Sequence, residues 1–426
     1  MKKVLIISWY FKPCSLTPSQ RITYWVENFH KHGFYPVVVT RTWSGEIRDY
    51  IDTKKAVGKG VVRERHGNYE VIYVPFKPGL ADWAFLKFSS GIFAPLFHLA
   101  KIVDVLTIGF TFLFSSYRNL LKETIKLAGK TSFQKVIISG EPFYLFKIGY
   151  ILRKKFNLNW IADYRDDWTT NELQTSRPGR IFRKLLMKVE RSYEKKWVTS
   201  AELVTSVSKL YTEKISNLLG VPGGTIPNGF DEKLLDLPKS PLKEVFTITY
   251  SGTLYPNQNI GIIINAIRCL KNEGTKVRVV FLGSGYEPSQ EARIKELLGD
   301  LYPDYGVVTD RYPRDRALEF LKQSHVLLSI AYGELGGIPS SKLYEYIGLL
   351  KPILLCPSDK DVMESIVLSA GLGFVANDVN ECVEQIKELM RRYNNKQIEH
   401  SIDENLGRVL PFGRACQLRL LASFLE

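Results

Sequence analysis

Residues of the kinds that build disulfide frames and metal sites are scarce in this sequence. It has five cysteines and six histidines among 426 residues, and no two cysteines have the Cys-x-x-Cys spacing. Scattered cysteines are typical of reduced thiols in a cytosolic protein, not of a disulfide frame or a zinc site. The chain also lacks a convincing Asp-x-Asp motif, so we expect neither a bound metal nor a cofactor.

An apolar run that is long enough and free enough of charge to cross a membrane is also missing. The most apolar stretch is 92–122, and three residues interrupt it: His98, Lys101 and Asp104. A spanning helix needs about 20 consecutive, mostly apolar residues. Basic residues lie at its ends, namely Lys87, Arg118 and Lys122. We therefore predict a peripheral segment on the inner face of the cell membrane, with a buried core helix as the alternative.

The balance of charge is strongly positive. Lys and Arg number 58 against 44 Asp and Glu, which gives a formal net charge of +14. Such a surface is either simply solvated or attracts anionic membranes and polyanionic ligands. The sequence has no basic-aromatic stripe of the kind that binds nucleic acid, no internal repeat and no low-complexity tract. Nucleic acid is therefore not an expected partner.

The first half of the chain alternates apolar strands with helical stretches. MKKVLIISWYF at the N-terminus has too short an apolar run for a signal peptide and instead predicts a first core strand of a cytoplasmic protein. The predicted strands are 4–10, 36–41, 69–75, 135–140, 160–166 and 203–208, and a helix is predicted over 19–32. Continuous Val/Ile runs separated by helices predict a parallel sheet covered on both faces.

The same alternation restarts after a segment rich in Pro, Lys and Asp, whose end at 236–244 we interpret as a linker. Four more strands are predicted, at 246–252, 277–283, 325–330 and 352–356. The predicted fold class is therefore α/β, with two doubly wound domains at 1–235 and 244–410. Ligands bind such sheets beyond the carboxyl ends of the strands, so we expect the active site in a cleft that the two domains face.

The segment GGIPSSKLYEYIGLLKPILL, residues 336–355, places two charged residues between buried elements. Ser340 or Ser341 can cap a helix, which puts Lys342 in the first turn, near the positive end of the helix dipole. A bound anion such as a diphosphate would explain a lysine at this position. Glu345 lies three residues further on the same face, so a surface ion pair is the alternative explanation.

Other strand ends also carry residues suited to ligand binding. Gly252 in TYSGTLYPNQN and the two glycines of FLGSGYE let a ligand approach the backbone. In the first half, WIADYRDDW gathers four charges at a strand end, which is costly unless they are solvated, paired or used. Arg21 follows the loop FKPCSLTPSQ, and Glu141 lies in SGEPF. For each of these loops a solvated surface is the alternative.

Taken in order, these motifs resemble those of GT-B glycosyltransferases of family 4, especially the bacterial enzymes that build surface polysaccharides. YFKPCSLTPSQR is similar to the family's N-terminal loop, WIADYRDDW to its Asp-x-Arg-Asp-x-Trp element, and IPNGFD to its interdomain motif. PSSKLYEYIGLLKPILL resembles the P-S-K-x-x-E-Y branch. The resemblance spans nearly the whole chain. It implies two Rossmann-like domains, with a closing helix at 411–426 packed back on the N-terminal one.

The resemblance implies that the C-terminal domain binds the donor, a sugar linked to a nucleoside diphosphate. A UDP-sugar is the first expectation and a GDP-sugar the second. Glu345 would accept hydrogen bonds from the ribose, and Lys342 with the start of its helix would neutralise the diphosphate. The candidate donor-binding residues are Ser251, Gly252, Thr253, Gln258, Gly283, Gly285, Ser341, Lys342 and Glu345.

By the same resemblance, the N-terminal domain binds the acceptor, a lipid-linked or polysaccharide intermediate in cell-surface glycan synthesis. The candidate catalytic residues are Asp163, Arg165 and Asp166, and the candidate acceptor-binding residues are Arg21 and Glu141. Transfer would retain the anomeric configuration, and no metal is implied. The alternatives are a GT-B sugar-nucleotide epimerase or phosphorylase and a non-catalytic GT-B-like binding module.

Two features depart from the family pattern. The first glutamate of the usual Glu-(seven residues)-Glu motif would fall at Gly337, and the nearby Glu334 is out of register. The usual basic pair of the donor loop is absent, with Gln258 and Asn259 near its place. A second diphosphate-binding cation is therefore expected elsewhere, and a catalytically inactive protein is a further alternative. The candidates for this cation are Arg314 and Arg316.

Overall fold

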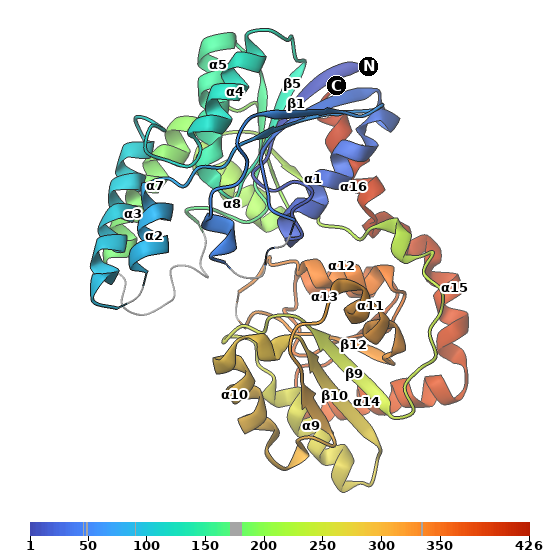
Figure 1. The fold of residues 1–426 in the computed structure, drawn as a ribbon. Coiled ribbons are helices and arrows are strands. Elements are labelled where there is room, and N and C mark those ends of the chain that lie inside the picture. The colour runs from blue at the N-terminus through green and yellow to red at the C-terminus, as the bar shows by residue number, and fades with distance from the viewer. Residues whose placement is uncertain (46, 48–49, 90, 171–180, 334) are drawn as a thin grey trace. The chain divides into compact units, whose positions relative to one another are not determined.

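The computed structural model describes residues 1–45, 47, 50–89, 91–170, 181–333 and 335–426 (Figure 1). Glu334 lies outside the described residues. The described chain divides into two compact units: unit 1 comprises Met1–Ile226 and Leu418–Glu426, and unit 2 comprises Pro227–Gln417.

Unit 1 is an α/β unit built on one sheet. Its strands are β1 (Lys2–Ile7), β2 (Phe34–Arg41), β3 (Val62–Arg65), β4 (Glu70–Val74), β5 (Lys135–Ser139), β6 (Trp160–Asp163), β7 (Leu203–Ser206) and β8 (Gly223–Thr225). Its helices are α1 (Thr17–Asn28), α2 (Leu80–Phe88), α3 (Ala94–Ile108), α4 (Arg118–Ala128), α5 (Phe146–Phe156), α7 (Ile181–Val198) and α8 (Lys209–Leu219). The strand order is β3-β4-β2-β1-β5-β6-β7-β8, and β3 runs antiparallel to β4 while the other neighbours are parallel.

The sheet of unit 1 is covered on both faces, as its apolar strands predict. Successive side chains of a strand point to opposite faces. Accordingly, Leu5 and Ile7 of β1 enter one core, whereas Val4 and Ile6 enter another. The second core also contains Leu418 and other residues near the end of the chain. This packing explains why the C-terminal residues belong to unit 1.

Unit 2 has a second, parallel sheet. Its strands are β9 (Phe246–Ser251), β10 (Val277–Leu282), β11 (Gly306–Val308), β12 (Val326–Ser329), β13 (Ile353–Leu355) and β14 (Gly373–Val375). The helices from here to the end of the chain are α9 (Gly261–Asn272), α10 (Pro288–Leu298), α11 (Arg314–Gln323), α12 (Ser341–Gly348), α13 (Val362–Ser369), α14 (Val379–Asn394), α15 (Gln397–Val409) and α16 (Arg414–Ser423). The strand order is β11-β10-β9-β12-β13-β14, with parallel neighbours throughout.

Both limits of unit 2 differ from the predicted ones. The division follows Ile226, earlier than 235, because Phe230 and Leu234 are buried in a core of unit 2 together with Leu343. The return to unit 1 begins at Leu418, later than 411. α16 therefore starts in one unit and ends in the other.

Each sheet contains a switch point, which is a pair of neighbouring strands whose following connections leave towards opposite edges of the sheet. In unit 1 this point lies between β1 and β5, because β2 lies on the other side of β1. In unit 2 it lies between β9 and β12, because β10 lies on the other side of β9. A crevice suited to ligands opens at the carboxyl ends of the strands at such a switch point. The loops after β1, β5, β9 and β12 are therefore the places to look for a site.

Candidate functional site

At the switch point of unit 2, the loop after β9 contacts the side chain of Lys342 on α12. Gly252 has a φ of 94°, and its N–H donates to Leu282 O at 2.7 Å. A Cβ at this position would lie 2.8 Å from Lys342 Cε. Glycine is favoured here by the left-handed backbone, and a larger residue would also displace the end of the Lys342 side chain.

The Lys342 side chain is directed at neutral oxygen atoms. Its Nζ donates to Tyr250 Oη at 3.2 Å and to Thr253 O at 3.1 Å, and lies 4.6 Å from the centroid of the Tyr250 ring. Burial lowers the pKa of Lys342 to about 7, against an opposing effect of Glu345. Neither hydrogen-bond partner carries a negative charge. A bound anion would therefore favour the protonated form of this lysine.

Glu345 pairs with a different residue. Its Oε2 lies 2.8 Å from Arg314 Nη2, and the Arg314 side chain is about half exposed. The sequence allowed a surface ion pair between Lys342 and Glu345. In the structure Glu345 instead pairs with Arg314. Such an exposed pair adds little to stability. Its consequence is that Arg314, one candidate for the second cation, is committed to orienting a carboxylate.

A tyrosine of α12 holds this helix against the end of β9, and the side chains at the start of the helix leave its first turn uncapped. The Ser251 N–H donates to the buried Tyr346 Oη at 2.9 Å. Ser340 occupies the N-cap position but makes no capping hydrogen bond with its side chain, and Ser341 is the first, exposed residue of the helix. N–H groups in a first turn that no side chain caps are suited to bind an anion.

The loops after β9 and β10 are joined to each other. The Gly283 N–H donates to Thr309 Oγ1 at 3.0 Å, and the Gly285 N–H donates to Thr309 O at 2.9 Å. Ser284 Oγ donates to Gly252 O at 2.7 Å. A Cβ at Gly285 would lie 3.0 Å from Thr309 O, and Gly283 has a φ of 76°. The predicted glycine positions therefore form one continuous edge of unit 2.

The structure adds a cation to this edge that the sequence did not single out. A Cβ at Gly283 would lie 3.8 Å from both the Arg311 and the Gly252 Cα atoms. The Arg311 guanidinium lies 3.7 Å from the centroid of the Tyr286 ring, and its charge helps to lower the pKa of Lys342. In the sequence Arg311 is one of several arginines in a polar loop, so its neighbourhood to Lys342 emerges only from the folded chain.

Arg316, the remaining candidate for the second cation, stacks elsewhere. Its guanidinium lies 4.2 Å from the centroid of the Tyr312 ring. Two residues earlier in the chain, Arg314 already holds Glu345. Of the three arginines in this segment, Arg311 is the one whose charge acts on Lys342.

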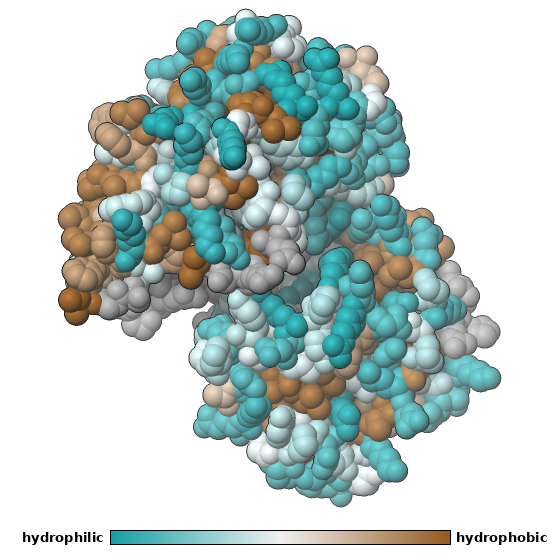
Figure 2. Space-filling view, viewed as in Figure 1, coloured by the Kyte–Doolittle hydropathy of each residue, from teal (hydrophilic) through white to brown (hydrophobic). Residues whose placement is uncertain are grey.

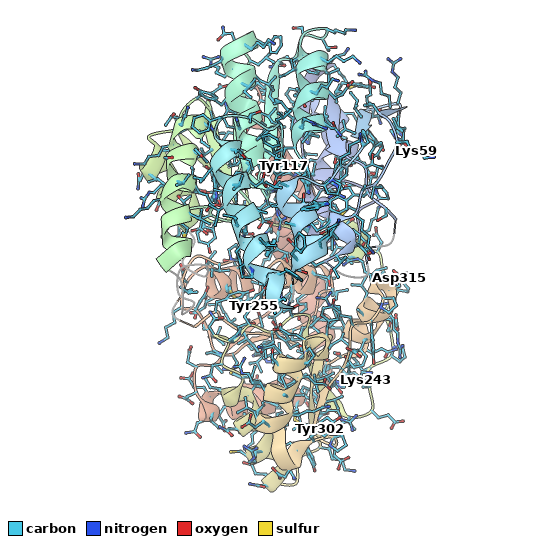
Figure 3. The ribbon with its side chains drawn as sticks, turned by 60° about the vertical axis from the view of Figure 1, so that its left-hand side comes forward. Lys59, Tyr117, Lys243, Tyr255, Tyr302 and Asp315 are labelled. Carbon is cyan, nitrogen blue, oxygen red and sulfur yellow. The ribbon has the colours of Figure 1, made fainter. Side chains whose placement is uncertain are left out.

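Gln258 is engaged in holding the loop together. It is 2 % exposed, its Nε2 donates to Ile330 O at 2.7 Å, and its Oε1 accepts from the Tyr255 N–H at 3.0 Å and from Tyr250 Oη at 3.2 Å. Tyr255, labelled in Figure 3, lies on this loop after β9. We therefore revise the expected role of Gln258: it ties the loop to the end of β12, and its burial removes it from ligand contact.

Gly337 occupies the position at which the family resemblance would place a glutamate, and the backbone there favours glycine. Gly337 has a φ of 75°, and its N–H donates to Asp361 Oδ2 at 2.8 Å. A glutamate here would adopt a left-handed conformation at a cost of about 1–2 kcal/mol. The carboxylate that the structure places beside this loop is that of Asp361, which the sequence did not single out.

In unit 1 the predicted charged residues separate into a buried and an accessible group. Asp163 is completely buried: its Oδ1 lies 3.2 Å from Arg21 Nη2 and accepts from Thr205 Oγ1, and its Oδ2 accepts from Ser139 Oγ. Arg21 also donates to Ile226 O at 2.9 Å. The ion pair explains both charges without a ligand. This corrects the catalytic assignment of Asp163 and the acceptor-binding assignment of Arg21.

The accessible group lies at the ends of β5 and β6. Glu141 Oε2 is 3.5 Å from Arg165 Nη1. Burial raises the pKa of Glu141, repulsion by Asp166 adds to this effect, and Arg165 opposes it. Glu141 also has a φ of 59°, in the left-handed region. Strained residues are often found in functional sites, so Glu141, Arg165 and Asp166 remain a candidate ligand-binding group.

Within the described residues, no group of three or more His, Cys, Asp or Glu side chains is arranged to hold a metal ion.

Two doubly wound parallel-sheet units, each with polar residues at its switch point, are the architecture of the GT-B fold. No protein-family model and no curated protein matches the sequence. Among solved structures, the chain is similar to sucrose-phosphate synthase from Thermosynechococcus elongatus (13% identity, TM-score 0.64, covering 100% of this chain and 98% of that chain). It is also similar to an E. coli trehalose-6-phosphate structure bound with UDP-2-fluoro glucose (13% identity, TM-score 0.66, covering 100% of this chain and 99% of that chain). A third similar structure is a glycosyltransferase from Rickettsia africae (10% identity, TM-score 0.60, covering 100% of this chain and 97% of that chain). These likenesses establish the GT-B fold over the whole chain.

Proposed function

We propose that the protein is a glycosyltransferase that moves a sugar from a nucleoside diphosphate to an acceptor hydroxyl. The observation that carries this proposal is the environment of Lys342, a partly buried amine with neutral hydrogen-bond partners and Arg311 nearby. Two cations beside glycine loops at a switch point suit a diphosphate. The similar E. coli structure is bound with UDP-2-fluoro glucose, which supports a UDP-sugar as the first choice of donor and a GDP-sugar as the second.

In this proposal the donor lies on the carboxyl edge of unit 2. Lys342 and Arg311 neutralise the diphosphate as the bond between the anomeric carbon and the phosphate oxygen breaks. Preorganised cations are among the strongest means of stabilising such a leaving group. Glu345, oriented by Arg314, accepts hydrogen bonds from the ribose hydroxyls. Gly252, Gly283 and Gly285 keep the edge open to the donor.

On the acceptor side, we assign the accessible group of unit 1. Arg165 and Glu141 position the acceptor hydroxyl, and Asp166 is the nearest alternative as a base. The acceptor oxygen forms the new bond to the anomeric carbon with retention of configuration, and its proton leaves with the departing diphosphate or with Asp166. The order of motifs in the chain supports an enzyme of the family 4 type, with a lipid-linked or polysaccharide acceptor in cell-surface glycan synthesis.

A second acceptor class follows from the similar structures. Two of them are named for sugar phosphates, sucrose-phosphate and trehalose-6-phosphate. The net charge of +14 would suit an anionic sugar-phosphate acceptor as well. Release of UDP in the presence of sugar phosphates, but not of lipid extracts, would favour this second class.

Thermal unfolding in the presence of nucleotides tests the donor site. The wild type is compared with Lys342→Ala and Glu345→Ala against UDP, GDP, ADP and CMP. A nucleotide at 100 times its Kd stabilises the folded state by about 2.7 kcal/mol. We expect one nucleoside diphosphate to stabilise the wild type and neither variant.

Lys351→Ala is a matched control for this test. Burial also lowers the pKa of Lys351, to about 8, but this lysine precedes β13 and therefore lies at the amino end of the sheet. The Lys351→Ala variant should respond to the nucleotide as the wild type does. If no nucleotide stabilises the wild type, or if Lys342→Ala responds normally, the donor site is not where we place it and a non-catalytic GT-B-like protein is favoured.

A further inference from the structure

An exposed apolar face covers the hairpin formed by α2 and α3. Along α3 and just beyond it, apolar residues recur every three or four positions and therefore share one side of the helix. They are Leu96, Leu99, Val103, Leu106 and Phe110, with exposed fractions between 37 % for Val103 and 88 % for Phe110. Further exposed apolar residues are Trp83 and Leu86 on α2 and Ile92 and Phe93 before α3. Together these nine residues are called the apolar face.

The apolar face is contiguous in space. Figure 2 shows brown side chains gathered over the part of unit 1 where Figure 1 places α2 and α3. Figure 3 turns this side towards the viewer, with both helices in front and Tyr117 labelled close to them. Large contiguous apolar patches are rare on proteins that neither bind a partner nor contact a membrane.

The opposite side of the hairpin accounts for its attachment to unit 1. Ala84 and Ala100 are buried, and small residues let two helices approach closely. The Tyr193 hydroxyl of α7 donates to Leu106 O at 3.0 Å. Val105 and Ile108 complete the buried side of α3. One side of α3 is therefore buried and the other is exposed, although apolar residues lie on both sides, and the alternative of a buried core helix is wrong.

Acidic side chains are few around α2 and α3. Between residues 77 and 122 the sequence has two carboxylates, Asp82 and Asp104. Asp82 is buried, lies 2.7 Å from Lys54 Nζ and accepts a hydrogen bond from the Gly79 N–H. Burial raises the pKa of Asp104 to about 7, so its charge is reduced near neutral pH. Neither carboxylate belongs to an exposed side chain.

Basic side chains near the apolar face, in contrast, are exposed: Lys77 just before α2, Lys87 in the last turn of α2 and Arg118 at the start of α4. The Lys87 ammonium lies 4.9 Å from the centroid of the Trp83 ring. Lys77 and Arg118 line a small pocket of about 80 Å³ that also contains Leu113 and Phe114, two further exposed apolar residues. Apolar side chains bordered by cations match the two layers of an anionic membrane surface, the acyl chains and the phosphates.

We propose that the apolar face docks peripherally on the surface of an anionic lipid bilayer, with Lys77, Lys87 and Arg118 at the level of the lipid phosphates. The described helices include none that is long and apolar enough to cross a bilayer. A second copy of the chain is a poorer occupant, because its identical cations would be brought against these ones. This inference is independent of the donor site and stands or falls separately from the proposed transferase activity.

Flotation with lipid vesicles tests the proposal on the full chain. The probes are vesicles of phosphatidylglycerol and phosphatidylcholine in equal parts, and vesicles of phosphatidylcholine alone. We expect the wild type to float with the first and to remain behind with the second. The variant Ile92→Ser/Leu99→Ser/Phe110→Ser should lose at least about tenfold in partitioning, because three exposed apolar side chains no longer enter the lipid.

Two variants separate the components of the interaction. Lys77→Gln/Lys87→Gln keeps the apolar face and should bind anionic vesicles about 25-fold more weakly, at about fivefold per cation. Leu368→Ser is the matched control, because Leu368 is 51 % exposed, close to the 56 % of Leu99, but lies on α13 of unit 2. It should float like the wild type.

The contrary outcomes are equally specific. Equal flotation of the wild type and the triple serine variant would overturn the proposal, as would a lack of binding to anionic vesicles at low salt. Sedimentation equilibrium, which measures the oligomeric state, tests whether the apolar face contacts a second copy of the chain. If the wild type is a dimer that the serine substitutions dissociate, and neither form binds vesicles, the apolar face contacts a second copy of the chain instead.

Discussion

The two switch-point edges of this protein treat charge in opposite ways. In unit 1, Asp163 is buried together with its counterion Arg21, and its oxygens accept further hydrogen bonds from hydroxyl groups. In unit 2, Lys342 donates to neutral oxygens and has Arg311 as a like-charged neighbour. A charge that is balanced within the protein contributes to folding, whereas one left unbalanced can be balanced by a ligand. The same architecture therefore holds a structural pair in one unit and a candidate anion site in the other.

The largest effect is expected when the buried ion pair of unit 1 is broken. Asp163→Asn leaves Arg21 buried without its counterion, and breaking such a pair costs about 3–5 kcal/mol. We expect urea unfolding to report a loss of stability of this size. Asp166→Asn, at an accessible position three residues on, should change stability by no more than about 0.5 kcal/mol. Normal stability of Asp163→Asn combined with lost transferase activity would restore the catalytic role first assigned to Asp163.

The next effect removes the unbalanced charge from unit 2. Lys342→Met keeps most of the side-chain volume but no charge, so a diphosphate bound as we propose would lose its main partner. We expect turnover, or donor affinity measured by calorimetry, to fall about 100-fold. The free energy of unfolding should stay the same or increase, because the substitution removes a partly buried charge. A large loss of stability with unchanged donor affinity would instead make Lys342 a structural residue.

A change of pH alters the same charge without a mutation. Lys342 has a pKa of about 7 in the folded protein, so its protonated fraction falls about tenfold for each pH unit above this value. Donor affinity should fall with the same slope. Its contribution to folding has the opposite sign: the unfolded lysine titrates at about 10.4 and binds more protons between these values, so stability rises with pH in that window. Calorimetric titrations with the donor from pH 6 to pH 9, in the wild type and in Lys342→Met, would test the first slope, and urea unfolding of the same two proteins over the same range would test the second.

Arg311 provides the control for this pH dependence. A guanidinium stays protonated throughout the range, so Arg311→Gln should weaken donor binding but keep a pH dependence. That dependence should move to higher pH, because the substitution removes a charge that helps to lower the pKa of Lys342. If Arg311→Gln and Lys342→Met flatten the pH profile equally, the proton is not carried by Lys342 alone and the assignment must be revised.

The smallest expected effect concerns the strain at Glu141. Its φ of 59° is unfavourable for a residue with a Cβ, by about 1–2 kcal/mol. Glu141→Gly relieves this strain and should stabilise unit 1 by up to about 1 kcal/mol relative to Glu141→Gln, because the gain in entropy of an unfolded glycine offsets part of the relief. Both substitutions remove the carboxylate, so both should slow transfer to the acceptor. Thermal unfolding and product formation measured on the same two variants separate backbone strain from the role of the charge.

Much of the fold follows from local patterns in the chain. The strands predicted at 36–41 and 135–140 lie within two residues of these limits, because a run of buried Val and Ile residues can satisfy both faces of a covered sheet. Four strands were missed: β3 (VRER), β8 (GGT), β11 (GVV) and β14 (GFV). All four are edge strands and too short to show a long apolar run; each is held by pairing with one neighbouring strand.

The sequence by itself determined that two doubly wound α/β units would carry their polar loops at strand ends, and that Lys342 would occupy an unfavourable place at a helix start. Those properties depend on hydrophobic periodicity and helix termini, which are local. Only the tertiary structure decided which charges meet: Asp163 pairs with Arg21, and Arg311 joins Lys342 at the edge of unit 2. Such contacts join residues distant in sequence, and they depend on the order of strands in each sheet, which no local pattern specifies.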